Sequence, residues 1–136
     1  MTANSDEYWA PICHIATKLR CWERLSANDG RARWVTDWSM LLAIPTAGYL
    51  EVGEGPVPIR YVEWVELSTL RVKGGLAGRP RQMIDVAEDI LSHLRQASIA
   101  WELRESIWSL KGLFDEEPVQ VIRVLNPFGP PPAPLS

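Results

Sequence analysis

The chain has 136 residues, of which 46% are hydrophobic and 23% are charged, and its formal net charge at pH 7 is -3. These values are ordinary for a globular protein with one hydrophobic core, so they exclude a largely disordered chain. The seven tryptophans are more than a small core comfortably hides, and we expect one or two of them at a partner surface.

The first expected element is a helix over about 8–26. Its apolar residues recur at spacings of three and four between Ile12 and Trp22, which predicts one buried stripe. Pro11 fits the first turn of this helix, where a missing N–H group is tolerated. The turn-forming residues at 28–30 are expected to end the helix.

Two cysteines, Cys13 and Cys21, lie on this expected helix. The helix would separate their Cα atoms by roughly 12 Å, whereas a disulfide needs less than about 7 Å. With His14 and His93 they are the candidate soft metal ligands, and their spacing does not match a structural zinc site. We therefore expect reduced thiols, no metal and no cofactor. The chain also lacks a signal-peptide pattern and an apolar run near the ~20 residues of a membrane span, which favours a cytoplasmic protein.

After the helix, the pattern changes from helical spacing to alternation. The segments 31–38, 40–45 and 48–52 are predicted strands, and the glycines and prolines of 53–58 predict a loop. The segment 59–67, IRYVEWVEL, is apolar near its middle on both faces. This pattern is typical of a central strand that is covered on two sides.

Glu63 interrupts this expected central strand. Strict alternation places Glu63 on one face with Tyr61 and Val65, and it places Glu66 on the opposite face. A buried carboxylate is costly unless it is paired. Three interpretations stay open. Glu63 pairs with an arginine such as Arg33 of a neighbouring strand, it faces solvent at the end of the covered region, or it lies on an uncovered patch that contacts a partner.

A second helix is expected to begin at Pro80, with an apolar face from Met83 to Leu94. The glycine-rich basic loop at 71–80 would then lead into a helix N-terminus, where unpaired N–H groups attract anions. The candidate anion-binding residues are Lys73, Gly75, Gly78, Arg79 and Arg81. They suggest a small-ligand or phosphate-binding domain, with or without catalytic activity, as an alternative function. The other interpretation is a solvated surface loop, because the spacing is not that of a Walker A loop.

Three more strands are expected after the second helix. Segments 98–103 and 107–113 are predicted to form a hairpin around a turn at 104–106, and 118–125 is the last strand. The residues that follow, 127–136, include five prolines and predict a proline-rich C-terminal tail.

The separate runs of helix and strand predict an α+β fold. In this fold two helices pack on a mostly antiparallel sheet of about five to six strands, in a single domain over 1–126.

Candidate catalytic residues are scarce. His14 and His93 are the candidate imidazole bases, no G-x-S-x-G motif is present, and neither cysteine has a recognisable catalytic context. A hydrolytic carboxylate pair of Glu63 with Glu51 or Glu66 is conceivable, but Glu63 and Glu66 cannot cooperate if they lie on opposite faces of one strand. We therefore expect a non-enzymatic protein.

The segment PIRYVEWVEL at 58–67, followed by LSHLRQASI at 91–99 and a closing hairpin, resembles small uncharacterised bacterial proteins of the immunity type. The resemblance covers about 34–113. It implies a protein that binds and blocks a cognate toxin of a toxin–immunity system. The glycine-rich loop and the proline tail are not part of this pattern.

An acidic and aromatic surface is the expected binding site for such a partner, which would then be a basic toxin domain. Its candidate residues are Trp38, Glu51, Glu54, Tyr61, Glu63, Glu66, Asp115, Glu116 and Glu117. A homodimer that buries exposed tryptophans is a further alternative. Nucleic-acid binding is not favoured, since no larger basic face supports the basic loop.

Overall fold

The computed structural model describes residues 5–40, 45, 48–53, 55–73, 78–80, 82–110 and 114–130, and their side chains except those of 108–110 and 114–116. The elements in chain order are α1 (Ser5–Leu19), β1 (Glu23–Asn28), β2 (Arg33–Val35), β3 (Tyr49–Val52), β4 (Gly55–Pro58), the short 3-10 helix η1 (Ile59–Tyr61), β5 (Val62–Ser68), β6 (Leu70–Lys73), β7 (Gln82–Asp85), α2 (Ala87–Gln96), β8 (Glu102–Leu110) and β9 (Phe114–Leu125).

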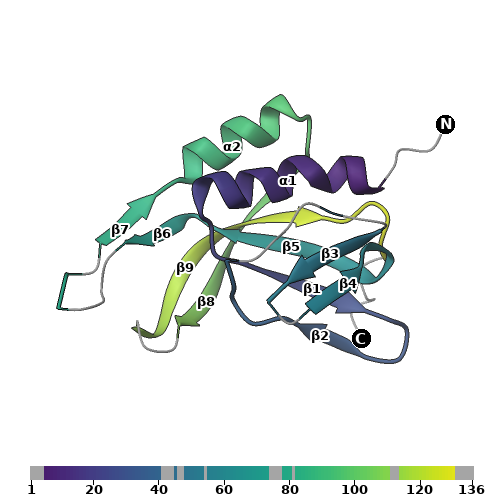
Figure 1. Ribbon diagram of the computed structural model, residues 1–136, viewed down its shortest axis with the longest axis horizontal. Coiled ribbons are helices and arrows are strands. Elements are labelled where there is room, and N and C mark those ends of the chain that lie inside the picture. The colour runs from purple at the N-terminus through teal and green to yellow at the C-terminus, as the bar shows by residue number, and fades with distance from the viewer. Residues whose placement is uncertain are drawn as a thin grey trace.

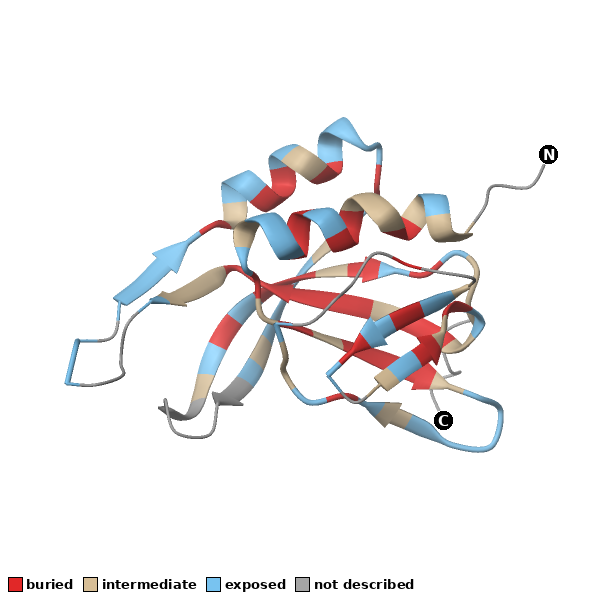
Figure 2. Cartoon of the chain, viewed as in Figure 1, coloured by how far each residue is buried: buried red, intermediate tan, exposed pale blue. Residues whose placement is uncertain are grey.

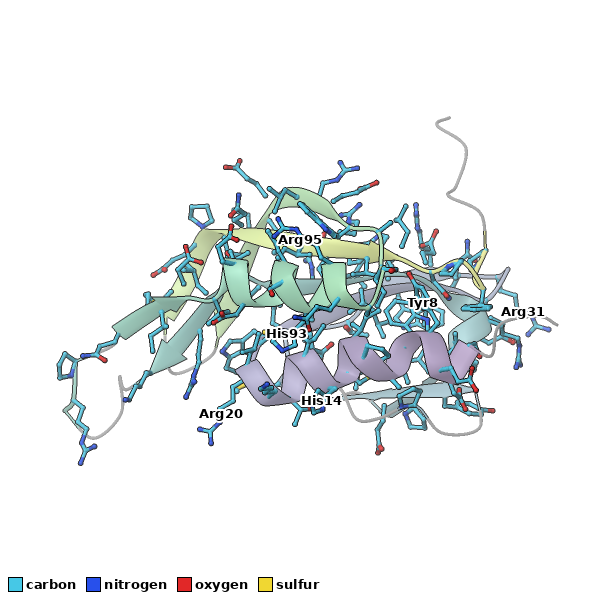
Figure 3. All side chains as sticks on the ribbon, turned by 90° about the horizontal axis from the view of Figure 1, so that it is seen from above. Tyr8, His14, Arg20, Arg31, His93 and Arg95 are labelled. Atoms are coloured by element: carbon cyan, nitrogen blue, oxygen red, sulfur yellow. The ribbon has the colours of Figure 1, made fainter. Side chains whose placement is uncertain are left out.

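The fold is α+β, as predicted (Figure 1). The main sheet has five strands in the order β2-β1-β5-β9-β8, and each neighbouring pair is antiparallel. Two further antiparallel hairpins, β3–β4 and β6–β7, stand beside it. Both helices lie on one side of the main sheet and, seen from above, run side by side (Figure 3). Neither described helix is long and apolar enough to cross a membrane.

The main core lies between the two helices and the sheet. It joins Ile12 and Ile15 of α1, Ile90 and Leu94 of α2, and the sheet residues that face them. Figure 2 shows this as buried residues along β5 and on the sheet side of both helices. We call this side of the sheet the helix face; its residues include Leu25, Ala27, Val62, Val65, Leu67, Ile122 and Val124. The opposite side is called the far face.

The first helix is shorter than predicted. It ends at Leu19, Arg20 has a positive φ of 52°, and the residues from Glu23 onward form β1 instead of more helix. Leu25 follows Trp22 by three residues, as in a helix. It is also buried while the preceding Arg24 is half-buried, as in a strand. Both periods fit so short a segment, and the pairing of β1 with β5 decides between them.

Residues 53–58 were predicted as a loop, and this was wrong for 55–58. Residues 55–58 form β4, which pairs with β3, the strand predicted at 48–52. The prolines at 56 and 58 are tolerated because this hairpin has only two strands, so their missing N–H groups can face outward. Most of the predicted strand at 40–45 lies outside the described residues.

The second helix begins at Ala87 and not at Pro80, so that prediction was also wrong. Residues 82–85 form β7, which pairs with β6 beyond the main sheet. The predicted apolar face is correct from Ile90 to Leu94, where it packs into the core.

The predicted turn at 104–106 is wrong as well, because β8 runs through it as one continuous strand. Its register with β9 extends from Glu102 opposite Arg123 to Leu110 opposite Phe114. The last predicted strand, 118–125, is confirmed as the greater part of β9. The alternation of β8 is weak, because its edge position leaves both faces partly exposed, so its sequence did not exclude a turn.

Asn126 fixes the end of β9 against the rest of the domain. Its side-chain oxygen accepts hydrogen bonds from Trp9 Nε1 at 3.1 Å and from the N–H of Phe128 at 3.1 Å. Its side-chain nitrogen donates to the carbonyl oxygens of Ile59 and Val62, each at 2.7 Å. Every hydrogen-bonding group of this buried amide is therefore used, which a buried polar side chain requires. The first residues of the predicted tail thus follow a firmly held strand end.

Candidate functional site

A row of charged residues crosses the far face of the main sheet. Arg24 of β1 lies opposite Glu66 of β5, Glu66 lies opposite Arg123 of β9, and Arg123 lies opposite Glu102 of β8. Glu66 is fully buried and accepts hydrogen bonds from Arg24 Nε at 2.7 Å and from Arg123 Nη2 at 2.7 Å. Charge therefore alternates in sign across four strands, which favours this register over its neighbours.

Two tryptophans cover the arginines of this row. The guanidinium carbon of Arg123 lies 4.2 Å from the ring centroid of Trp64. That of Arg24 lies 4.9 Å from the Trp38 ring and 5.7 Å from the Trp64 ring. These are cation–π distances, so the rings stabilise the charge of both arginines. We call Arg24, Trp38, Trp64, Glu66 and Arg123 the far-face cluster.

The main sheet curls so that its two edges, near β2 and at β8, approach each other over the far face. Arg24 of β1 donates a hydrogen bond to the hydroxyl of Ser106 on β8, although β5 and β9 lie between these strands. Trp38, which follows β2, donates its indole N–H to the backbone oxygen of Ile107 at 3.2 Å. Long side chains thus connect the two ends of the sheet and hold its curvature.

Glu63 is paired internally, which confirms the first of the three interpretations. Arg33 of β2 binds it with two parallel hydrogen bonds, Nε to Oε1 at 2.6 Å and Nη2 to Oε2 at 2.8 Å, and Ser26 donates to Oε1 at 2.8 Å. Burial acts to raise the pKa of this carboxyl, but the hydrogen bonds from Arg33 and Ser26 outweigh it and hold the pKa below its usual value.

The expectation that Glu63 and Glu66 face opposite sides of the strand was wrong. Ser26 pairs with Trp64, whereas Ala27 pairs with Val62, so Glu63 is an extra residue in β5 at a β-bulge. The bulge turns Glu63 to the far face, where it meets Ser26. Alternation along a single strand cannot reveal an inserted residue.

The residues of the predicted acidic surface therefore separate into those that are buried or half-buried and those that face solvent. Glu63 and Glu66 are buried in ion pairs, and they present little negative charge to a partner. Trp38 is half-buried in the far-face cluster. Tyr61 is half-buried beneath the guanidinium of Arg60, whose carbon lies 4.6 Å from the ring centroid.

Glu51 is the predicted acidic residue that clearly faces solvent. It lies on β3 on the same side as Tyr49, which is 43% exposed, while Leu50 and Val52 point into the core. Glu117 is half-buried on β9. Glu54 and the side chains of Asp115 and Glu116 lie outside the described residues.

The predicted anion site loses its physical basis. Lys73 ends β6, and Gly78 and Arg79 follow in the exposed connection to β7, so none of them stands at the N-terminus of α2. Gly75 and Arg81 lie outside the described residues. Without a helix terminus, the described part of this loop is a hairpin connection with exposed basic side chains.

Glu23 is a feature that the sequence did not reveal, because its segment was assigned to a helix. It lies on β1 opposite Leu67, it is fully buried, and neither of its carboxyl oxygens has a hydrogen-bond partner among the described residues. Burial raises its pKa to about 8, and the nearby Ser39 hydroxyl acts in the opposite direction. Near neutral pH this group therefore holds its proton.

The two cysteines are buried and unbonded. Burial raises the pKa of both thiols to about 12, and for Cys13 the Glu23 carboxyl adds to this. A thiol in that state is a poor nucleophile at neutral pH. Within the described residues, no group of three or more His, Cys, Asp and Glu side chains could hold a metal ion.

Comparisons with protein-family models, with curated proteins and with solved structures found no match for this chain.

Proposed function

We propose that this is a non-enzymatic protein-binding protein, and that it acts as an immunity-type inhibitor of a basic toxin domain. The binding surface is the outer side of the β3–β4 hairpin. The observation that supports this choice is the exposure of Tyr49 and Glu51 side by side on β3, with the alternate residues Leu50 and Val52 anchored in the core.

Charge on this hairpin has one sign. Between 48 and 58 the sequence carries Glu51 and Glu54 and no basic residue. An acidic surface complements a basic partner and speeds their encounter, and tyrosine supplies contact area at low entropic cost. Because the other side of the hairpin is part of the core, the surface is held rigidly, which reduces the ordering cost of binding.

The proposed surface is smaller than the one that the sequence suggested. Glu63 and Glu66 are excluded from it because arginines already neutralise them inside the protein. Their role is to hold the curled sheet that carries the hairpin. Tyr49 takes the aromatic role that had been given to Tyr61.

The first test is to purify the tagged protein from its native host and to identify what co-purifies in stoichiometric amount. A basic protein that loses its toxicity in the complex is the expected result. The double variant Glu51→Arg with Glu54→Arg should then weaken the complex at least tenfold, and Tyr49→Ala should weaken it further.

The matched control is Arg95→Glu on α2, an exposed charge reversal away from the hairpin. It should leave affinity for the partner unchanged. Wild-type affinity in the Glu51/Glu54 double variant would reject the hairpin as the binding surface. A preparation without any stoichiometric partner would count against the proposed function itself.

A further inference from the structure

The β8 strand is a long edge of the main sheet. It has nine residues and pairs with β9 on one side. Leu103 and Ile107, on its helix face, are 48% and 54% exposed, and Ile107 is the most exposed of the large hydrophobic side chains that the structure describes. An exposed edge with apolar side chains is a template for pairing with another strand.

The backbone groups that point outward from this edge follow from the register. Glu105 lies opposite Gln120, and the oxygen of Gln120 accepts a hydrogen bond from the N–H of Thr69, on the side away from β8. The pair of Glu105 and Gln120 is therefore a non-hydrogen-bonded pair of the antiparallel ladder. By the period of two, the N–H and C=O groups of Leu103, Glu105 and Ile107 point to the outer edge.

One end of this edge is already covered. The oxygen of Ile107 accepts the indole N–H of Trp38, and Arg24 reaches the neighbouring Ser106 from the far face. Leu103 and Glu105 are exposed, and no described residue hydrogen-bonds to their outward groups. A strand added here must therefore pair around Leu103.

We propose that the strand added at this edge is β8 of a second copy, paired antiparallel about a two-fold axis at Leu103. Directly opposite residues of an antiparallel pair point to the same face of the sheet. The two-fold axis must therefore lie between two copies of the same residue. An axis at Arg104 or at Glu105 would place two like charges directly opposite each other, which is unfavourable. An axis at Leu103 places two leucines there instead.

The charges beside the axis complement each other. In this register Glu102 of each copy lies opposite Arg104 of the other, and it does so twice because of the two-fold symmetry. Within one chain Arg104 and Glu102 already pair at 3.0 Å. Their side chains remain 52% and 39% exposed, so each can exchange this ion pair for one across the axis. The dimer would join two five-stranded sheets into one continuous sheet.

The test uses charge reversal at these two positions. The wild-type protein should dimerise in sedimentation-velocity experiments over a concentration series. Glu102→Arg would place arginine opposite arginine, and Arg104→Glu would place glutamate opposite glutamate, so each variant alone should remain monomeric. An equimolar mixture should form a heterodimer, because each chain then offers the charge that the other lacks.

The control for this test is Glu51→Arg, an exposed reversal on β3 that should dimerise like wild type. Circular dichroism and thermal unfolding would show that all variants are folded. A wild-type protein that stays monomeric up to millimolar concentration would overturn the proposal. So would variants that dimerise as tightly as wild type, or a mixture that stays monomeric. These outcomes are independent of partner binding at the hairpin.

Discussion

Glu66 and Glu23 are both fully buried carboxyl groups on neighbouring strands, yet they are stabilised in opposite ways. On the far face, Glu66 receives an arginine from the strand on each side of it. On the helix face, Glu23 lies opposite Leu67, and it keeps its proton because burial raises its pKa to about 8. A buried acid can be tolerated by pairing its charge or by suppressing it, and the face of the sheet selects which of the two occurs.

The largest expected effect comes from Glu23. Its pKa in the folded protein is raised to about 8 from a usual value of 4.5, so its stabilising contribution is complete below pH 4.5 and is lost as pH rises through 8. Over that window the free energy of unfolding should fall by on the order of 4 kcal/mol. Gln does not ionise in either state, so the stability of Glu23→Gln should not fall in this way, and the variant should be more stable than wild type at pH 8.

Urea unfolding of wild type and Glu23→Gln at pH 5 and pH 8 measures this effect. The difference between the two proteins should grow with pH. Parallel stabilities at both pH values would mean that Glu23 ionises freely, and the contrast with Glu66 would then disappear.

Glu66→Leu should have the next largest effect. It leaves Arg24 and Arg123 without their shared carboxylate beneath the two tryptophans. Removing one partner of a buried ion pair costs about 3–5 kcal/mol, and we expect about 3 kcal/mol because both arginine side chains are about a fifth exposed. Urea unfolding at neutral pH measures this loss, and a cost below about 1 kcal/mol would show that the pairs contribute little.

Glu63→Gln should have a smaller effect, since Arg33 is about half exposed and can turn toward water. We expect a loss of about 1 kcal/mol at pH 7. Because the pKa of Glu63 is lowered in the folded protein, its contribution is present above its usual pKa and is lost as pH falls through the lowered value. The difference between this variant and wild type should therefore shrink in acid, opposite to the trend for Glu23. A difference that is constant with pH would contradict the ion pair.

Glu51→Gln gives the reference for an exposed carboxylate and should be the smallest effect of the series. It lies on the outer side of β3 and should change the free energy of unfolding by less than about 0.5 kcal/mol. A larger loss would indicate that the outer side of the hairpin contributes to the fold as well as to binding.

Much of the fold could be predicted from the sequence, and the failures have physical causes. The apolar spacing of Ile12 and Ile15, and that of Ile90 and Leu94, placed the core sides of both helices correctly, because one stripe of each helix meets the sheet. The prediction of helix from Glu23 onward was wrong, because the apolar residues of so short a stretch fit both the helical and the strand period until its pairing is known.

The site divides in the same way. The cost of burying a carboxylate predicted an arginine partner for Glu63, and Arg33 is that partner. The partners of Glu66 could not be predicted, since they depend on strand order, which brings Arg123 beside β5 across 57 residues of chain. The bulge at Glu63 escaped prediction because the inserted residue is visible only against the partner strand.

The amide of Asn126 has a consequence for the time course of synthesis. Its bond to the indole of Trp9 joins positions 117 residues apart, and the Tyr8 hydroxyl reaches the oxygen of Leu125 over the same separation. Helix α1 emerges from the ribosome early, but these contacts become available only once β9 and the residue after it have been made. The helix must therefore wait for more than a hundred later residues before it can dock fully, and the fold is completed only after β9 has been made.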